Sequence, residues 1–337
     1  MRMKILLTGA TGFIGRKLAT RLVEEGHELT AFVRESSNRS GLPEGTIFIE
    51  GDMFNQKALE SAVQGQEVVI HLAAYFDFYP SDEDLMFKTN VEGTRNLLNV
   101  CVSALVERFI YCSTTEVIGP VRFPPGNEDT ELRPNYAYGE SKILAESLIT
   151  KVCSETELNY IILRPTGVFG EGDFYVMYEV IKELYEERIP ALPSNLESKF
   201  MFAHVDDVVE GFVAAVDSQS ALNNKMILCP DEPMSWSELV ELITNHLQVK
   251  SPRLRVPRSL AKAGMVVLGP LRRRSAQIGK HSFFWNPKAV DDIFSSRVYT
   301  NEKAKRLLGW SPKYSMQEGL IITMDWYLEK GHLKREG

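Results

Sequence analysis

Cysteine is scarce in this chain of 337 residues, and long hydrophobic runs and a positive net charge are missing. Its four cysteines lie far apart with no CxxC pair, which excludes a small disulfide scaffold and indicates reduced thiols in a cytoplasmic protein. No apolar run reaches the ~18 residues that a membrane-spanning helix needs. The apolar stretch after Lys4 is about four residues long, shorter than the ~7–15 of a signal peptide. The formal net charge of -7 argues against wholesale nucleic-acid binding.

Short β-branched or aromatic runs alternate with amphipathic stretches in the first half of the chain. The runs of strand length are residues 4–8, 28–33, 46–50, 68–72, 109–112 and 160–163, and the helical patterns are 12–25, 56–63, 84–102 and 138–155. Strands that alternate with helices at this spacing form parallel sheets covered on both faces. The sequence therefore predicts an α/β fold with a Rossmann-type, doubly wound parallel sheet.

The alternation becomes less regular after residue 172. Residues 187–199 contain two prolines and predict a loop, whereas 204–216 predict a helix and 226–229 one more strand. The capping boxes Ser235–Glu238 and Ser315–Glu318 predict further helix starts. We therefore expect a smaller, α-rich C-terminal substrate lobe. The predicted boundaries are 1–172 with a return segment at about 200–230 for the nucleotide-binding domain, and 173–199 with 231–337 for the lobe.

A glycine-rich turn follows the first predicted strand and opens the first predicted helix. Its glycines are Gly9, Gly12 and Gly15. In this position, the first glycine makes the tight turn, the second admits a pyrophosphate and the third lets helix and strand pack closely. The N–H groups and the dipole of the helix N-terminus favour the negative charge of a diphosphate. We therefore expect a dinucleotide cofactor.

The end of the second predicted strand bears on which dinucleotide binds. A free ribose 2′-hydroxyl is met by Asp or Glu about 20 residues beyond the glycines. Val33 occupies that position, and Arg34 follows it. Because a guanidinium binds a phosphate through charge-assisted hydrogen bonds, we expect NADP(H) rather than NAD(H). Arg39 either assists Arg34 or is a solvated loop charge.

Tyr138 and Lys142 form a YxxxK pair at the start of a predicted helix. Positions i and i+4 share one helix face, so the ammonium lies near the phenol. A cation roughly 6 Å away at an effective dielectric of about 20 stabilises the phenolate by on the order of 2.8 kcal/mol, which lowers a pKa of about 10 towards ~8. Tyr178 and Lys182 repeat the spacing, but they follow the sixth strand and predict ordinary helix residues.

Together these segments resemble an extended short-chain dehydrogenase/reductase of the NAD-dependent epimerase/dehydratase superfamily. The resemblance covers nearly the whole chain. Its motifs are TGATGFIG at 8–15, GD at 51–52, HLAA at 71–74, NVEGT at 90–94, STT at 113–115, the YxxxK pair, LRP at 163–165, HVDD at 204–207 and LGWSP at 308–312.

This resemblance assigns roles to individual residues. It implies that Thr114 supplies the catalytic hydroxyl and acts with Tyr138 and Lys142. The family more often has Ser at the position of Thr114, and Ser113 and Thr115 are the alternatives. It also implies a homodimer that pairs through helices flanking the YxxxK segment. The expected cofactor contacts are Gly9, Thr11, Gly12, Phe13, Ile14, Gly15, Arg34, Asp52, Met53, Ala73, Ala74, Tyr138, Lys142, Pro165 and Val168.

Three activities of this superfamily compete: alcohol/ketone oxidoreduction, nucleotide-sugar epimerisation and sugar dehydration. Dehydratases of the superfamily carry a Thr-Asp-Glu run where this chain has Thr114, Thr115 and Glu116. The acid that would protonate the leaving hydroxyl is therefore missing, which disfavours dehydration. Nucleotide-sugar enzymes carry Arg at about the position of Phe200 and Asn at the position of Gly167, so this chain lacks both polar contacts. A desolvated diphosphate needs such partners, which disfavours epimerisation. The remaining resemblance is to the dihydroflavonol reductase and 3β-hydroxysteroid dehydrogenase-like branch.

We therefore expect an NADP(H)-dependent oxidoreductase that interconverts a secondary alcohol and a ketone on a cyclic, apolar small molecule. Alternatives are a nucleotide-sugar epimerase and a non-catalytic NADP(H)-binding sensor or scaffold. Aromatic side chains line pockets for apolar rings as readily as they fill cores. The expected substrate contacts are Tyr75, Phe76, Thr115, Phe174 and Tyr175, and Phe283, Phe284 and Trp285 are further aromatic candidates.

Two remaining segments carry unusual charge. At 204–207 the two carboxylates predict a helix cap, and we expect no metal site. Residues 251–281 contain eight Lys or Arg and no Asp or Glu, around an apolar run from Leu260 to Leu271. This segment is either a solvated cap on a packed helix or a surface that makes weak contact with an anionic partner.

Overall fold

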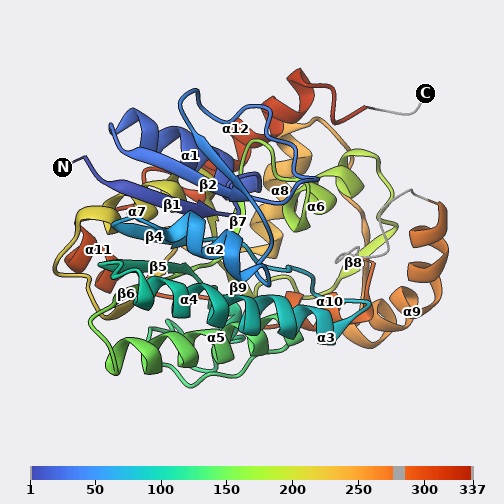
Figure 1. Cartoon of the computed structure of the whole chain (residues 1–337). Helices are drawn as coiled ribbons and strands as arrows, with labels where there is room; N and C mark the ends of the chain where they lie inside the picture. Colours follow the sequence, from blue (N-terminus) through green and yellow to red (C-terminus); the bar gives the residue numbers. More distant parts are fainter. Residues whose placement is uncertain (1, 276–284, 335–337) are drawn as a thin grey trace.

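A seven-stranded parallel sheet forms the centre of the protein, whose computed structural model describes residues 2–275 and 285–334 (Figure 1). The strand order β11-β6-β5-β4-β1-β2-β3 reverses direction beside β1, and such a reversal places a ligand crevice at the carboxyl ends of the strands. The predicted Rossmann-type sheet is thus confirmed. The strands are β1 (Lys4–Thr8), β2 (Glu28–Val33), β3 (Ile47–Glu50), β4 (Val68–His71), β5 (Arg108–Cys112), β6 (Asn159–Pro165) and β11 (Asn224–Leu228).

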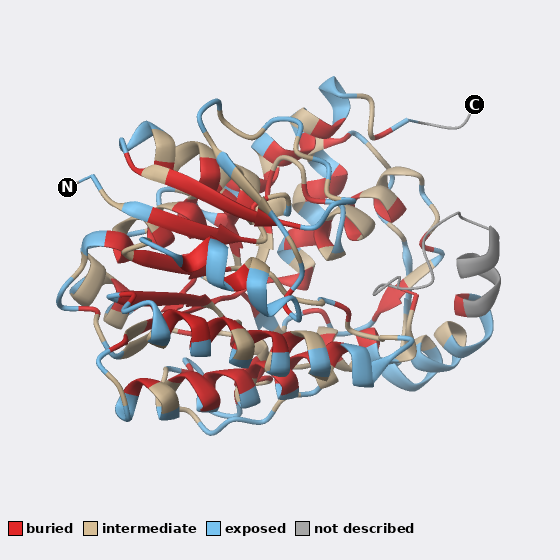
Figure 2. Cartoon of the chain, in the orientation of Figure 1, coloured by how far each residue is buried: buried red, intermediate tan, exposed pale blue. Residues whose placement is uncertain are grey.

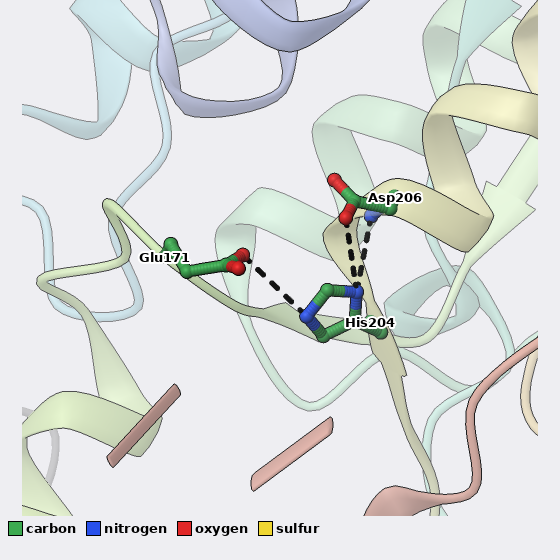
Figure 3. A group of neighbouring side chains, drawn as sticks. All are labelled: Glu171, His204 and Asp206. Atoms are coloured by element: carbon green, nitrogen blue, oxygen red, sulfur yellow. Dashed lines mark hydrogen bonds and ion pairs between the residues drawn. The ribbon is translucent and has the colours of Figure 1, made fainter. Parts of the chain in front are cut away.

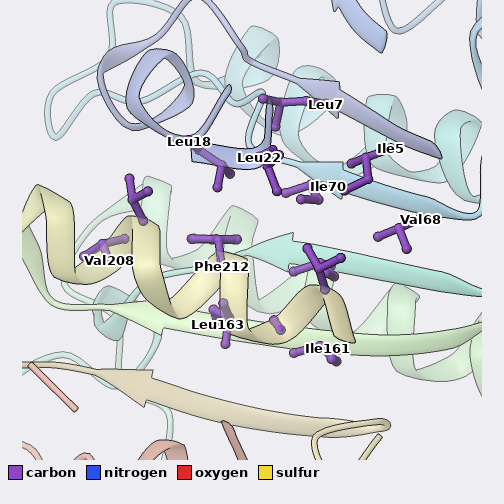
Figure 4. Packing of buried hydrophobic residues seen from close by; sticks show 14 of the residues in the cluster. Ile5, Leu7, Leu18, Leu22, Val68, Ile70, Ile161, Leu163, Val208 and Phe212 are labelled. Atoms are coloured by element: carbon purple, nitrogen blue, oxygen red, sulfur yellow. The ribbon is translucent and has the colours of Figure 1, made fainter. Parts of the chain in front are cut away.

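Alternating side chains from the strands fill two hydrophobic cores, one on each face of the sheet. In β1, Ile5 and Leu7 enter one core and Leu6 enters the other. Figure 4 shows the first core, where strand residues pack against Leu18 and Phe212 from the covering helices. Because both faces are covered, β1, β2 and β4 are mostly buried, as Figure 2 shows, whereas the edge strand β3 is exposed or half-buried along its length.

Helices cover the two faces in separate layers. On one face lie α1 (Phe13–Glu24) and α7 (Val205–Asp217), and on the other α2 (Gln56–Val63), α4 (Gly93–Ser103) and α5 (Ala137–Ser154). The predicted helix 84–102 is divided into α3 (Glu83–Phe87), a π-helix (Lys88–Glu92) and α4. A π-helix inserted in a longer helix is frequent at functional sites.

A third core lies beside the sheet and is built mainly from helices. Its main elements are α6 (Val176–Tyr185), α8 (Trp236–His246), α10 (Pro287–Ile293) and α12 (Met316–Glu329). Both predicted capping boxes are confirmed, and they begin α8 and α12. The helix α11 (Glu302–Leu308) falls within the range predicted for the lobe, but its Ala304 packs in the core of the α1 and α7 face.

Three two-stranded sheets connect the C-terminal segments. They pair β7 (Gly167–Phe169) with β10 (Phe202–His204), β9 (Lys199–Phe200) with β12 (Met234–Ser235), and β8 (Ala191–Pro193) with β13 (Leu254–Val256). The prediction of a continuous loop over 187–199 was therefore wrong at β8 and β9, because each strand pairs with a segment distant in sequence.

The remaining helix, α9 (Arg258–Ser275), follows β13 at the end of the molecule opposite the N-terminus (Figure 1). Among the described residues, no helix combines the length and the apolar composition needed to cross a membrane. All four cysteines are free thiols, as their spacing predicted.

Candidate active site

The glycine-rich turn between β1 and α1 has the geometry that its three glycines predicted. Gly9 has a φ of 75°, and a Cβ there would lie 2.7 Å from the backbone nitrogen of Ala73. A Cβ on Gly15 would lie 2.0 Å from the carbonyl oxygen of Gly9. Gly12 is exposed and is the N-cap residue of α1. The turn thus leaves open backbone at a helix N-terminus, which is suited to a diphosphate.

Arg16 fastens this turn to the loop after β2. Its Nε donates to the carbonyl oxygen of Thr11 at 3.1 Å, and its guanidinium also donates to the carbonyl oxygens of Asn38 and Ser40. The segment that begins with Arg34 is thereby held near the turn. Sequence reasoning missed Arg16, whose charge and position on α1 are unremarkable without the fold.

A cavity of about 280 Å³ extends from the glycine-rich turn to the start of α5. It brings together most residues that the sequence predicted for cofactor, catalysis and substrate. Its lining includes Gly9, Gly12, Phe13, Ile14, Gly15, Ala74, Phe76, Thr114, Tyr138, Lys142, Pro165, Val168 and Tyr175 from the predicted set, and Leu72, Phe78, Cys112, Ser113, Glu116, Thr166, Gly167, Val176 and Phe202 in addition.

The YxxxK pair lies in the first two turns of α5, with both side chains against the cavity. The Lys142 ammonium donates to the carbonyl oxygen of Cys112 at 2.8 Å and to the Tyr111 hydroxyl at 3.2 Å. Its Nζ lies 5.7 Å from the centre of the Tyr138 ring. β5 therefore fixes the lysine that faces the phenol.

The predicted acidification of Tyr138 was wrong in direction for the protein alone. Burial raises the pKa of the Tyr138 phenol well above its ordinary value, and the neighbouring Cys112 and Glu116 act in the same direction. Burial also lowers the pKa of the Lys142 ammonium to about 8, so this group keeps most of its charge at neutral pH and loses it in mildly alkaline solution. The sequence argument counted the attraction but not the desolvation of the two groups.

Three hydroxyl residues follow β5, and the structure separates their surroundings. Ser113 donates to Glu146 at 2.6 Å and is buried. Thr115 is also buried and lies outside the cavity lining. The Thr114 hydroxyl lines the cavity and accepts the N–H of Glu116 at 3.2 Å. Thr114 is therefore the hydroxyl best placed to meet a substrate beside Tyr138. Thr115, which the sequence predicted as a substrate contact, does not line the cavity.

An aromatic segment at 75–79 forms another wall of the cavity. Asn90 of the π-helix accepts the N–H of Tyr75 at 2.7 Å and donates to its carbonyl oxygen at 3.0 Å. The same amide donates to Ser141 on α5, so it ties the segment to the YxxxK helix. The Phe76 ring lies 4.9 Å from that of Tyr138 in an edge-to-face arrangement. Tyr75 itself does not line the cavity.

Several predicted site residues lie away from the cavity. Phe174 is exposed and contacts the rings of Tyr178 and His332 at 5.2 and 4.9 Å. Trp285 is buried among α8, α9 and α10, and Phe283 and Phe284 lie outside the described residues. The other predicted contacts outside its lining are Thr11, Arg34, Asp52, Met53 and Ala73, all at or beyond the carboxyl ends of β1 to β4.

Glu116 is a cavity residue whose role the sequence did not indicate. Its Oε1 pairs with Arg297 at 2.6 Å, and Arg297 also pairs with Asp292 at 2.8 Å. The other carboxylate oxygen, Oε2, is buried and has no hydrogen-bond partner among the described residues. Only the folded chain shows this, because Arg297 is remote from Glu116 in sequence. A polar group of a substrate would satisfy that oxygen.

A second polar cluster lies at the N-terminus of α7 (Figure 3). Ligand atoms of Glu171, His204 and Asp206 lie within 4.8 Å of one another, a spacing that a metal ion could use. The Lys17 ammonium lies 2.8 Å from Asp206 and 3.2 Å from Glu171, so it already forms ion pairs with both carboxylates. Of the described residues, this is the group that meets the spacing of metal ligands. The expected absence of a metal site stays a prediction.

The predicted role of the two carboxylates in capping α7 was wrong. The imidazole of His204 caps the helix, since its Nδ1 accepts the N–H of Asp206 at 3.4 Å. Asp207 instead accepts the N–H groups of Lys313 at 2.7 Å and Tyr314 at 3.2 Å. It therefore holds the LGWSP segment against the sheet domain.

Comparisons with known proteins identify the family of this chain. The NAD dependent epimerase/dehydratase family matches residues 5–228. The chain is 26% identical to a 3-beta-hydroxysteroid dehydrogenase from Mycolicibacterium neoaurum, over 97% of this chain and 92% of the relative. It is also 26% identical to a decarboxylating sterol-4-alpha-carboxylate 3-dehydrogenase from Mus musculus, over 99% and 92% of the two chains.

Solved structures show the same fold over almost the whole chain. The crystal structure of gox2253 superposes with a TM-score of 0.82 at 28% identity, over 99% of this chain and 100% of that chain. A UDP-glucose 4-epimerase from Thermotoga maritima superposes with a TM-score of 0.78 at 23% identity, over 97% and 99%. The match over residues 5–228 shows that this chain belongs to the NAD dependent epimerase/dehydratase family and is an NAD(P)-dependent enzyme of the extended short-chain dehydrogenase/reductase type.

Proposed function

We propose that this enzyme interconverts a secondary alcohol and a ketone on a cyclic, apolar, steroid-like molecule and prefers NADP(H). One observation carries the proposal: Thr114, Tyr138 and Lys142 meet the aromatic ring of Phe76 in a single cavity that begins at the glycine-rich turn. The names of the relatives, a 3-beta-hydroxysteroid dehydrogenase and a sterol dehydrogenase, support the class of substrate.

The polar residues at the base of the cavity divide the work of proton transfer. In reduction, the hydroxyls of Thr114 and Tyr138 donate hydrogen bonds to the ketone oxygen, and Tyr138 gives its phenolic proton to that oxygen and is left as the phenolate. In oxidation, the Tyr138 phenolate accepts the proton of the alcohol hydroxyl. Lys142, fixed by Tyr111 and Cys112, stabilises the phenolate and would hold the nicotinamide ribose of a bound cofactor. Bound NAD(P) supplies the group that accepts or donates the hydride.

The walls of the cavity support an apolar ring rather than a nucleotide sugar. Phe76, Phe78, Tyr175 and Phe202 line it, and its charged lining residues are Glu116 and Lys142. A substrate diphosphate would therefore meet the carboxylate of Glu116, and the only cation that it would find in that lining is the catalytic Lys142. Such a group needs several charge-assisted partners when it leaves water. Epimerisation of a nucleotide sugar is the weaker candidate for this reason.

Phe200, at the position where nucleotide-sugar enzymes carry an arginine, also argues against a nucleotide-sugar substrate. Its side chain is buried and stacks on Trp236 at a ring distance of 4.4 Å. It is thus part of the helical core. Lys199, one residue earlier, is exposed. Neither residue lines the cavity.

The surroundings of Arg34 support the preference for NADP(H). Arg34 is exposed beyond the carboxyl end of β2, and its side chain makes no ion pair with any residue that the structure describes. Arg39, the second basic candidate, already pairs with Glu50 and lies over the Phe48 ring. A ribose 2′-phosphate therefore finds its available guanidinium at Arg34.

The free thiols support the expected cytoplasmic location.

An assay that follows the absorbance of the reduced nicotinamide distinguishes the candidate functions. Purified protein is offered NADP(H) and NAD(H) with 3β-hydroxysteroids, simpler cyclic alcohols and ketones, and UDP-sugars. We expect net cofactor turnover with the cyclic apolar substrates and a higher kcat/KM with NADP(H). Conversion of a UDP-sugar to its epimer would contradict the proposal, and tight cofactor binding without turnover on any compound would support the sensor or scaffold.

A further inference from the structure

The basic segment 251–281 concentrates positive charge in an otherwise acidic protein. It contributes eight Lys or Arg and no Asp or Glu, so the remainder of the chain carries -15, because the whole carries -7. Most of the segment forms β13 and α9 in the structure. Two of its charges are partly neutralised, since Arg258 and Lys262 pair with Asp291 at 2.8 and 2.7 Å.

The inner side of α9 covers an apolar cavity of about 170 Å³. Leu260, Gly264, Met265 and Leu268 line this cavity from α9, and Trp285 lines it from the start of α10. These helix positions recur at intervals of three and four, so they form one face. The inner face thus has the composition that packing against the body of the protein requires.

The outer side of α9 is apolar as well. Ala263, Val266 and Val267 lie three and four positions apart, and all three are exposed. The exposed fractions of Val266 and Val267 are 59% and 65%. On the preceding strand, Leu254 is also 59% exposed. Figure 2 shows most of the described surface of this helix as exposed. A helix that is apolar on both sides is normally covered on both sides.

We propose that the outer face of α9 binds the surface of an anionic lipid bilayer. The three exposed apolar residues would enter the boundary between headgroups and acyl chains. The exposed basic residues Arg253 and Arg255 would meet the lipid phosphates. The helix would lie flat on the bilayer, because a spanning helix needs about 20 apolar residues.

Charge favours a bilayer over a second copy of this chain. A two-fold dimer through α9 would place two strongly basic segments face to face, and like charges repel across an interface. Anionic lipid offers the opposite charge together with an apolar phase for Val266 and Val267. Neither feature depends on the proposed reaction.

Vesicle co-sedimentation with the full chain tests this proposal. The vesicles are phosphatidylcholine alone and phosphatidylcholine mixed with phosphatidylglycerol, each at low and high salt. We expect binding to the mixed vesicles, with loss of binding on removal of the anionic lipid or at high salt. Equal binding to both kinds of vesicle, or no binding to either, would overturn the proposal.

Two variants separate the role of α9 from general stickiness. The double variant Val266→Ser, Val267→Ser removes the outer apolar pair, and we expect about tenfold weaker binding to mixed vesicles. Leu105→Ser removes a side chain that is 83% exposed on a turn outside the basic segment, and it should bind as the unchanged protein does.

Thermal unfolding checks that all three proteins fold alike. Undiminished vesicle binding by the double variant would contradict the assignment to α9. Light scattering gives a second check. If the unchanged protein is a dimer without lipid and the double variant is a monomer, a second copy covers the outer face and the assignment to lipid is contradicted.

Discussion

Arg34 and Arg39 lie five residues apart, yet they have different surroundings. The guanidinium of Arg39 is engaged by Glu50 and Phe48, while that of Arg34 is free to meet a ligand. A charge-assisted hydrogen bond contributes about 1.5–3 kcal/mol, which corresponds to roughly a tenfold to hundredfold change in affinity. The proposed preference for NADP(H) therefore depends on one residue.

We predict that Arg34→Ser weakens NADPH binding by roughly tenfold or more and leaves NADH binding unchanged. Arg39→Ser is the matched control and should change neither affinity substantially. Fluorescence titration of the two reduced cofactors gives both dissociation constants. An Arg34→Ser protein that still discriminates NADPH from NADH as the unchanged enzyme does would contradict the assignment.

The sequence predicts residue positions better than residue energetics. Spacing and order placed Tyr138, Lys142 and Thr114 correctly on one cavity, because the helix period and the carboxyl ends of parallel strands determine where such side chains meet. The direction of the Tyr138 pKa was wrong, because desolvation depends on how the whole fold covers the side chain. Glu116 was missed for the same reason, since its partner Arg297 comes from the far end of the chain.

At the scale of elements, a buried polar chain joins β1, β4 and α4. Nδ1 of His71 lies 2.7 Å from the Thr8 hydroxyl, and its Nε2 lies 3.0 Å from that of Thr94. Burial lowers the pKa of His71 to about 3, and the nearby Lys142 charge acts in the same direction. The folded protein thus keeps this imidazole neutral while the unfolded chain protonates it near pH 6.5.

This shift predicts loss of stability in mild acid. As the pH falls from 6.5 towards 3, the unfolded state binds a proton that the folded state does not, so the free energy of unfolding decreases. The full loss from His71 is on the order of 5 kcal/mol. Urea unfolding at a series of pH values measures it as the difference between the unchanged protein and His71→Asn. Equal pH slopes for the two proteins would contradict the buried, neutral state of His71.

Elements with strong local signals were predictable, and elements that depend on distant partners were not. All seven strands of the main sheet follow from apolar runs, because buried parallel strands are apolar on both faces. The π-helix at 88–92 has no sequence signature, since Asn90 is drawn into it by contacts with Tyr75 and Ser141. Likewise, β8 forms only because β13 lies beside it.

At the scale of the whole molecule, the candidate site lies where the sheet meets the helical core. The sheet contributes the glycine-rich turn and the residues after β5, while Tyr175 and Phe202 come from segments that also contact the helical core. The predicted domain ranges express this division, but residues 302–310 pack with the sheet because Ala304 and Trp310 join its core. α9 lies at the outer end of the helical part (Figure 1).

The central claim is that the Tyr138 phenol transfers the proton in this cavity, and the Tyr138→Phe variant tests it most directly. Its turnover of a cyclic alcohol or ketone is compared with that of Tyr178→Phe, which removes a phenol of the second YxxxK pair that donates to the His332 carbonyl oxygen. We predict a fall in kcat of roughly 10²–10⁴ for Tyr138→Phe with little change in cofactor affinity, and near-normal turnover for Tyr178→Phe. A Tyr138→Phe enzyme that retains turnover would contradict the account.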